Sequence, residues 1–283
     1  MINDWLKLYS INSVENLLDA KREIMQEITL AGLARTDFFK HATFYGGTAL
    51  RVFYKINRYS EVLDFSLNNK NAGFDLSNYF SAIQEEFALL GLEVNISIKE
   101  KRNFTTIQSA FLKENTIWGL ISLNDEVQRM TNFPNIKIKI EIDRDPPLLF
   151  DKEEKLLMRP YSFYLSCMTL PSLFAGKMHA VLFREWKSRV KGRDWYDFEW
   201  YIKRGVKFKL NQFVDRAINS GHLFENHNYS QDDFLKLLRV RIDQLDIDSA
   251  KLDISQFISN PVELNIWSKQ YFHELVDKIQ FDS

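Results

Sequence analysis

The 283-residue sequence predicts a mixed α/β (α+β) domain followed by an all-helical domain. Short strand-like runs alternate with helical patterns up to about residue 150, as in a domain built around a sheet. The clearest run, residues 136–143, alternates isoleucine with charged residues, which is typical of a half-buried strand. Strand signals fade after about residue 160, so we expect a first domain at residues 1–160 and a helical bundle at residues 161–283.

The individual elements follow from local patterns. Residues 12–34 have the apolar spacing of an amphipathic helix, with Asn12 as the expected N-cap. A short strand over 43–45 leads through a glycine turn into a helix over 49–55. The other expected elements are a strand over 62–67, a helix over 75–91, two or three strands within 92–123, and helices over 170–188, 193–204, 211–219, 231–240 and 260–278.

Composition excludes several classes of protein. Lys and Arg together number 37 against 38 Asp and Glu, so a globally basic nucleic-acid binder is excluded and any RNA contact requires local clustering. Cys167 is the only cysteine, which excludes an intramolecular disulfide and fits a reducing compartment. No apolar run has the length of a signal peptide or a membrane span. We therefore expect a cytoplasmic protein with no membrane association.

The glycine turn and the strand after it could bind a phosphate and a metal ion. Gly46, Gly47 and Thr48 lie between a strand and a helix, where the backbone can approach an anion and helix amides can bind it. The next strand carries Asp64, and Val62 lies two residues earlier on the same face. Carboxylates at both positions would hold Mg²⁺ while substrate phosphates complete its shell, but only Asp64 is present. A plain turn and a surface aspartate are the alternative.

The alternating strand carries two more acids on its polar face. Glu141 or Asp143 could serve as a base near a metal ion. The alternative is a solvated face on which Lys137 and Lys139 are ion-pair partners of these acids.

The helical half carries a basic run that ends at two acids three residues apart. The run consists of Arg184, Lys187, Arg189, Lys191 and Arg193, followed by Asp194 and Asp197. Such a cluster could neutralise a triphosphate or an RNA backbone, and a solvated helix face is the alternative.

Together these stretches resemble the AbiEii/AbiGii toxin family, nucleotidyltransferases of bacterial abortive-infection (phage defence) and toxin–antitoxin systems. The matching stretches, which span about residues 10–205 in the order of the family, are GGTAL at 46–50, RYSEVLDF at 58–65, KMHA at 177–180 and KGRDWYD at 191–197. The resemblance implies a polymerase-β-like nucleotidyltransferase domain followed by a helical domain. It also implies Mg²⁺-dependent transfer of a nucleotide from an NTP to an RNA acceptor, expected to be the 3′ end of tRNA, with a cognate antitoxin as a partner.

The resemblance also implies roles for single residues. The implied catalytic residues are Ser60, Asp64, Glu141, Lys177 and Asp194, the last two contributed to the cleft by the helical domain. The implied nucleotide-binding residues are Gly46, Gly47, Thr48, Arg58, Ser60, Lys177, Lys191, Arg193 and Asp197, and the implied metal ligands are Asp64 and Glu141.

Two residues depart from the pattern of the family. Lys191 replaces an arginine, which keeps the charge but loses bidentate phosphate contacts. Val62 replaces the first metal-binding aspartate, and valine offers no oxygen for a two-metal clamp. The protein is then a catalytically dead nucleotide- or partner-binding protein, an inactivated variant of an active toxin, or a weakened enzyme in which Asp64 and Glu141 retain one metal ion.

A small-molecule phosphotransferase or adenylyltransferase of the same superfamily is a further alternative. The basic run from Arg184 to Arg193 argues against it, because such a run suits a polyanionic acceptor.

Overall fold

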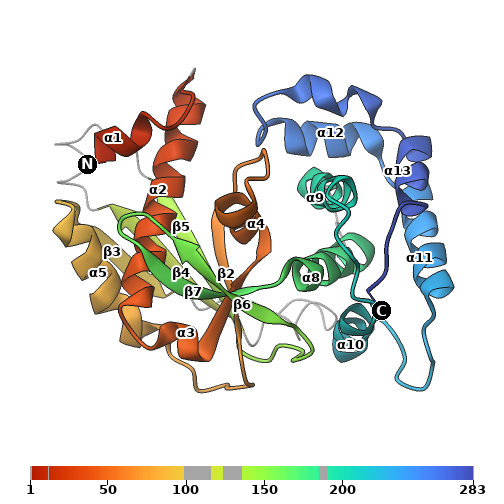
Figure 1. Cartoon of the computed structure of the whole chain (residues 1–283), viewed down its shortest axis with the longest axis horizontal. Helices are drawn as coiled ribbons and strands as arrows, with labels where there is room; N and C mark the ends of the chain where they lie inside the picture. The colour runs from red at the N-terminus through yellow and green to blue at the C-terminus, as the bar shows by residue number, and fades with distance from the viewer. Residues whose placement is uncertain (1, 12, 99–115, 124–135, 185–189, 283) are drawn as a thin grey trace. The chain divides into compact units, whose positions relative to one another are not determined.

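The computed structural model describes residues 2–11, 13–98, 116–123, 136–184 and 190–282 (Figure 1). The chain forms two compact units. The first consists of Met1–Tyr54, Tyr59–Pro146 and Glu153–Cys167, and the second of Lys55–Arg58, Pro147–Lys152 and Met168–Ser283.

The first unit is built around a mixed sheet. Among the described residues, seven strands pair in the order β3–β4–β5–β2–β1–β7–β6. Their bounds are β1 Ala42–Tyr45, β2 Val62–Leu67, β3 Val94–Ile98, β4 Thr116–Leu123, β5 Lys137–Asp143, β6 Lys152–Leu157 and β7 Phe163–Met168. Strand β2, which carries Val62 and Asp64, pairs in parallel with β5 and antiparallel with β1. The expected metal-binding strand is therefore central in the sheet.

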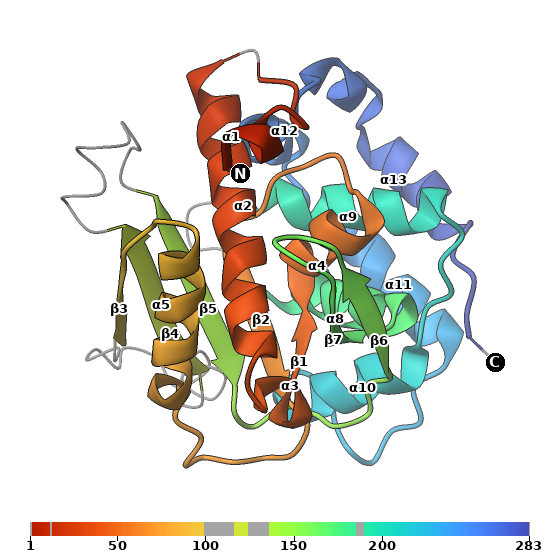
Figure 2. The ribbon, with the colours of Figure 1, turned by 60° about the vertical axis from the view of Figure 1, so that its left-hand side comes forward.

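Helices α2 and α5 cover one face of this sheet (Figure 2). The helices of the unit are α1 Ile2–Leu6, α2 Val14–Ala34, α3 Phe38–His41, α4 Gly46–Tyr54, the 3₁₀ turn η1 Leu76–Tyr79 and α5 Phe80–Leu89. Phe38, Phe44, Phe65 and Ile140 are fully buried, and the rings of Phe38 and Phe65 meet edge to face with centroids 4.9 Å apart. Burial of each such side chain stabilises the fold by about 1.5–3 kcal/mol.

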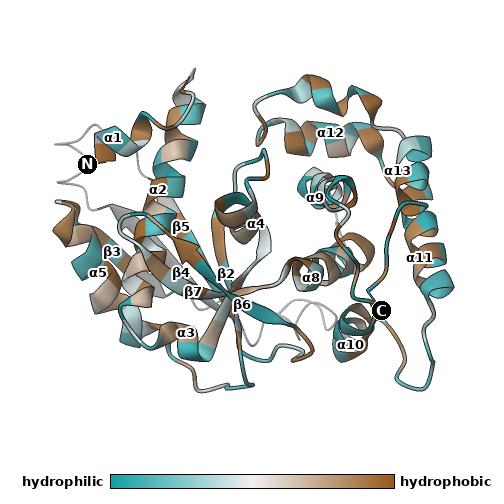
Figure 3. Ribbon diagram, in the orientation of Figure 1, coloured by the Kyte–Doolittle hydropathy of each residue, from teal (hydrophilic) through white to brown (hydrophobic). Residues whose placement is uncertain are grey.

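The second unit is helical apart from short connecting segments. It contains α8 Leu170–Phe183, α9 Gly192–Lys203, α10 Leu210–Asn219, α11 Gln231–Asp243, α12 Ile247–Ser255, the 3₁₀ helix η2 Pro261–Ile266 and α13 Lys269–Val276. Helix α8 is apolar along most of its length (Figure 3), and it supplies Phe174 to a buried aromatic core with Phe198, Phe208 and Phe234. No helix of the described part of the chain is both long and apolar enough to cross a membrane.

The structure confirms most of the expected elements and shifts their ends. The first long helix begins at Val14 with Ser13 as its N-cap, whose hydroxyl accepts a hydrogen bond from the Asn16 amide, whereas Asn12 lies outside the described residues. The alternation over 136–143 is confirmed, because its isoleucines are buried. The strands expected within 92–123 and the end of the helix expected over 170–188 lie partly outside the described residues.

The chain divides later than the expected boundary at residue 160. Strand β7 lies beyond that point and pairs with β1 through Phe44 and Cys167, so the first unit continues to Cys167. Strand β6 reads KEEKLL and occupies a sheet edge, where charged residues are common, and it therefore lacks the alternation that predicts a strand. The helix expected over 260–278 is two elements, η2 and α13, the second capped by Ser268.

The glycine of the KGRDWYD stretch allows α9 to approach α12 closely. A Cβ added at Gly192 would lie 1.9 Å from the carbonyl oxygen of Ala250. We expect Gly192→Ala to lower the free energy of unfolding by about 1–3 kcal/mol, because the two backbones must separate. Urea denaturation measures this effect.

Gly176 in α8 provides the matched control. Its added Cβ would have no neighbour within 4 Å, so Gly176→Ala should be neutral or stabilise the protein by up to about 1 kcal/mol through helix propensity. Equal effects at the two glycines would contradict the close-packing role of Gly192.

Candidate functional site

The glycine turn and the strand acid lie against each other in the first unit. Gly46 begins α4 with a φ of +83°, a conformation that glycine adopts without strain, and Gly47 is the second residue of the helix. A Cβ added at Gly46 would lie 2.5 Å from Oδ2 of Asp64. The carboxylate of Asp64 therefore fills the space that any other side chain at position 46 would need. It lies at the amino end of α4, where the helix dipole favours a negative charge.

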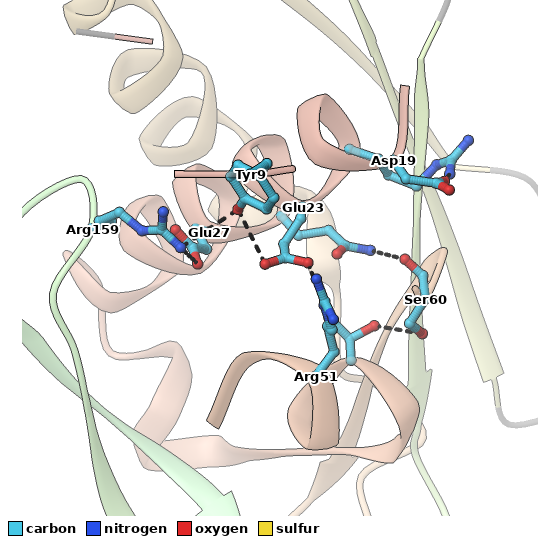
Figure 4. A network of polar contacts seen from close by, with 10 residues as sticks. Tyr9, Asp19, Glu23, Glu27, Arg51, Ser60 and Arg159 are labelled. Carbon is cyan, nitrogen blue, oxygen red and sulfur yellow. Dashed lines mark hydrogen bonds and ion pairs between the residues drawn. The ribbon is translucent and has the colours of Figure 1, made fainter. Parts of the chain in front are cut away.

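Hydrogen bonds to α2 and α4 hold the segment that leads into β2 (Figure 4). Gln26 donates from Nε2 to the carbonyl oxygen of Ser60 at 3.0 Å. Oγ1 of Thr48 lies 2.9 Å from Oγ of Ser60, and it also donates to the carbonyl of Val62. The hydroxyl of the buried Thr48 thus binds groups within the protein. This arrangement fits a positioning role for Thr48 and does not support the expected nucleotide contact through its side chain.

A chain of polar contacts continues along α2 behind this segment (Figure 4). Arg51 donates to Glu23 at 2.6 Å, and Tyr9 donates to the other oxygen of Glu23 at 3.1 Å. Burial and the nearby Glu23 raise the pKa of Tyr9, so its hydroxyl stays a donor. Arg51 also lies over the ring of Tyr59, with its guanidinium carbon 4.6 Å from the ring centroid. These residues support the backbone next to Ser60.

Sequence reasoning missed this network, since its members are distant in sequence. One local signal was available, because Glu23 and Glu27 are four residues apart and therefore lie on one face of α2. Glu27 accepts a hydrogen bond from Arg159 at 2.7 Å.

The parallel pairing of β2 with β5 brings four residues together on one face of the sheet. Asp64 is the register partner of Glu141, and Val62 is the register partner of Lys139. Nζ of Lys139 lies 2.6 Å from Oε1 of Glu141. The interpretation of Lys139 as an ion-pair partner of this acid is therefore confirmed. We call Val62, Asp64, Lys139 and Glu141 the β2–β5 quartet.

The β2–β5 quartet does not fit a two-metal centre. Such a centre clamps two ions about 3.5–4 Å apart with shared carboxylates. The quartet offers two carboxylates, one of which already binds an ammonium group, and Val62 has no donor atom. Asp143 is the register partner of Ser66, two residues beyond Glu141 on the same face of the sheet. Throughout the part of the chain that the structure describes, no group of three or more His, Cys, Asp or Glu side chains is arranged to hold a metal ion.

The helical unit contains a second cluster, in which Lys177 of α8 joins two acids of α9. Nζ of Lys177 lies 2.8 Å from Oδ1 of Asp194 and 2.8 Å from Oδ2 of Asp197. Arg58, which belongs to this unit, donates to both oxygens of Asp197 at 2.5 and 2.6 Å. Arg184 donates to Asp194 at 3.2 Å. We call these five residues the α8–α9 charge cluster.

The pairing of Arg58 with Asp197 corrects one expectation. Both were expected to bind nucleotide, but their side chains are 2% and 0% exposed, and they bind each other in a bidentate pair while Asp197 also contacts Lys177. Their role in this structure is to fix the 55–58 segment to α9.

Asp194 is ionised at neutral pH. Burial alone would raise its pKa, but the charges of Lys177 and Arg184 outweigh burial and lower the pKa to about 2. The carboxylate thus acts as a fixed partner of the Lys177 ammonium and is unsuited to donate a proton.

Two cations of the predicted basic run lie at the start of α9. Arg193 stacks on the ring of Phe257 with its guanidinium carbon 4.0 Å from the centroid, and Lys191 precedes Gly192. Both side chains are partly exposed. Lys187 and Arg189 lie outside the described residues.

The predicted site residues therefore form two groups, one in each unit. Gly46, Gly47, Thr48, Ser60, Asp64 and Glu141 gather around α4, β2 and β5 of the first unit. Arg58, Lys177, Asp194 and Asp197 belong to the α8–α9 charge cluster of the second unit, and Lys191 and Arg193 lie at the start of α9.

Comparisons with known proteins identify the family and the fold. A family model described as the nucleotidyl transferase AbiEii toxin of type IV toxin–antitoxin systems matches residues 28–278. MenT4, a nucleotidyltransferase toxin from Mycobacterium tuberculosis H37Rv, has a similar structure, with a TM-score of 0.55 and 13% identity over 98% of this chain and 89% of that chain. JHP933 from Helicobacter pylori gives a TM-score of 0.51 and 18% identity over 92% and 94%. At these identities the two structures support the fold alone, and they confirm the expected mixed α/β architecture. No curated protein matches the chain in sequence.

The bidentate pair of Arg58 and Asp197 should be essential for stability. We expect Arg58→Ala to lower the free energy of unfolding by about 3–5 kcal/mol, because it leaves a buried carboxylate without its bidentate partner. The double variant Arg58→Met, Asp197→Leu should recover part of this loss. Arg239→Ala is the control, because the pair of Arg239 with Asp277 is largely exposed and should contribute less than about 1 kcal/mol. Similar losses at Arg58 and Arg239 would contradict the buried role.

The lowered pKa of Asp194 should appear in the acid dependence of stability. Its pKa of about 2 in the folded protein lies below the value of about 3.9 in an unfolded chain. The resulting stabilisation is complete above about pH 5 and is lost as the pH falls through about 2. Asp194→Asn should therefore flatten the fall in the free energy of unfolding between pH 5 and pH 3, measured by urea denaturation at each pH. An unchanged slope would show that Asp194 is not the paired acid.

Proposed function

The chain belongs to the AbiEii family of nucleotidyltransferase toxins, and we propose that it transfers a nucleotide from an NTP to an RNA acceptor. The enzyme class and the type IV toxin–antitoxin setting follow from the family. The observation that carries the proposal is the contact of Asp64 with the glycine that begins α4. It combines, in one unit, a carboxylate and the amino end of a helix.

The first unit supplies the groups that a triphosphate needs. The backbone N–H groups at Gly46 and Gly47 suit a phosphate, since they are at the positive end of the α4 dipole. NTPs enter such sites as magnesium complexes, and we assign Asp64 as the carboxylate offered to the substrate-borne Mg²⁺. Ser60 is held next to this position by Gln26 and Thr48.

The reaction joins the terminal hydroxyl of the acceptor to the α-phosphorus of the NTP. A new oxygen–phosphorus bond forms, the bond between the α-phosphorus and the bridging oxygen breaks, and pyrophosphate leaves. The hydroxyl proton needs an acceptor, for which Glu141 is our candidate, although its ion pair with Lys139 competes with that role. Lys177, oriented by Asp194, is our candidate for neutralising phosphate charge.

We assign the acceptor to RNA, with the 3′ end of tRNA as the specific expectation. Lys191, Arg193 and Arg184 provide local positive charge in a chain whose net charge is −1. Such an enzyme would act in the cytoplasm, where NTPs and tRNA occur, and a cognate antitoxin would restrain it.

Val62 favours a second candidate function. A site that lacks one carboxylate could bind nucleotide or a protein partner without chemistry, or retain only weak activity. Restoring the missing acid separates these outcomes.

The test is transfer of label from α-³²P NTPs to total tRNA in the presence of Mg²⁺. We expect weak labelling by the unmodified chain and at least about tenfold more by Val62→Asp, because the added carboxylate completes the metal ligands. Val62→Asn is the matched control, since it adds a polar group of the same size without the charge and should give no gain.

Each of the other outcomes of this experiment supports a different conclusion. Nucleotide binding by calorimetry with no labelling, even by Val62→Asp, would support the binding protein. Label on a small-molecule acceptor instead of RNA would support the phosphotransferase or adenylyltransferase alternative. Neither binding nor labelling would overturn the proposed function.

A further inference from the structure

We propose that the Lys139 ammonium is a built-in replacement for a metal ion at Glu141, so that the β2–β5 quartet accepts at most one divalent cation, at Asp64. The inference takes from the proposed function only that the ligand is a divalent cation. Its test measures metal binding in the absence of nucleotide and RNA.

The register of β2 and β5 brings the ammonium to this place. Glu141 is opposite Asp64, and Lys139 is two residues before Glu141 on the same face. The ammonium lies 2.6 Å from Oε1 of Glu141, the distance of a charge-assisted hydrogen bond. A divalent ion such as Mg²⁺ would need the same oxygen at about 2.0–2.1 Å. The two cations would repel each other, so they compete for Glu141.

Val62 offers Lys139 no carboxylate at its register position on the neighbouring strand. Lys139 is the register partner of residue 62, and opposite charges at such positions attract across strands. An aspartate at 62 would give the ammonium a second acid and would offer a metal ion a third carboxylate. With valine there, the formal charges of Asp64, Glu141 and Lys139 sum to −1, which is a weak attraction for a second divalent ion.

The ion pair is accessible, as exchange with a metal ion requires. The side chains of Lys139 and Glu141 are 39% and 25% exposed. The pair of Arg58 and Asp197, by contrast, is buried and has no such freedom. Metal ions from solvent can therefore compete with the Lys139 ammonium for Glu141.

The experiment titrates the full chain with Mn²⁺ and follows free Mn²⁺ by electron paramagnetic resonance. We expect Lys139→Met to lower the Kd for Mn²⁺ by at least about tenfold, because it removes the competing charge and frees Glu141. Lys139→Arg keeps a cation and should keep the weak affinity. Adding Glu141→Gln to Lys139→Met should return the affinity to that of the unmodified chain.

Lys155→Met is the matched control. Lys155 also pairs with a glutamate two residues away on a strand, Glu153 at 3.0 Å, but it belongs to β6 at the sheet edge. Its removal should leave Mn²⁺ binding unchanged. A thermal melt of each variant checks folding, and Lys139→Gln replaces Lys139→Met if the latter fails to fold.

Two results would overturn the proposal. One is an unchanged or higher Kd in Lys139→Met, and the other is tight binding of two Mn²⁺ ions by the unmodified chain. Neither result decides whether the chain transfers nucleotides. Failure of the inference and failure of the proposed function are therefore distinguishable.

Discussion

The parallel register between β2 and β5 is the constraint on which the candidate site depends. It pairs Asp64 with Glu141 and Val62 with Lys139 on one face, while Leu63 and Ile140 are buried on the other. A slip by one residue would bring these apolar side chains to the polar face, so burial of the core fixes the register. The loss of an oxygen ligand at position 62 therefore cannot be relieved by sliding a strand. The neighbouring charge, Lys139, decides what the remaining acids can bind.

The RYSEVLDF stretch serves both units of the chain. Arg58 belongs to the helical unit, where it binds Asp197, whereas Ser60 and Asp64 belong to the sheet unit. Its polar residues therefore have different physical roles. Arg58 supports the fold through a buried pair, whose disruption is costly, whereas Asp64 lies against Gly46 at the amino end of a helix. A match to the sequence motif alone does not distinguish a charged residue with a structural role from one that contacts substrate.

The parts of the site with a local signal could be predicted from the sequence. The glycine turn, the strand with Asp64 and the alternation around Glu141 each have a pattern of their own, and the structure confirms these elements. The pairing of Arg58 with Asp197 had no local signal, because 139 residues separate the partners and charge patterns do not report burial. Strands β6 and β7 were missed because β6 is a charged edge strand and β7 ends in four successive buried residues, which give no alternating pattern. The contacts of Gln26 and Arg51 depend on how α2 packs, which periodicity alone does not specify.

The most direct test of the central claim is a crystal structure of the unmodified chain with Mn²⁺ and a non-hydrolysable NTP, with anomalous scattering recorded for manganese. The account predicts one manganese peak, beside Asp64, with the Lys139 ammonium still within about 3 Å of Glu141. Two peaks about 3.5–4 Å apart, shared by Asp64 and Glu141 with Lys139 displaced, would contradict it.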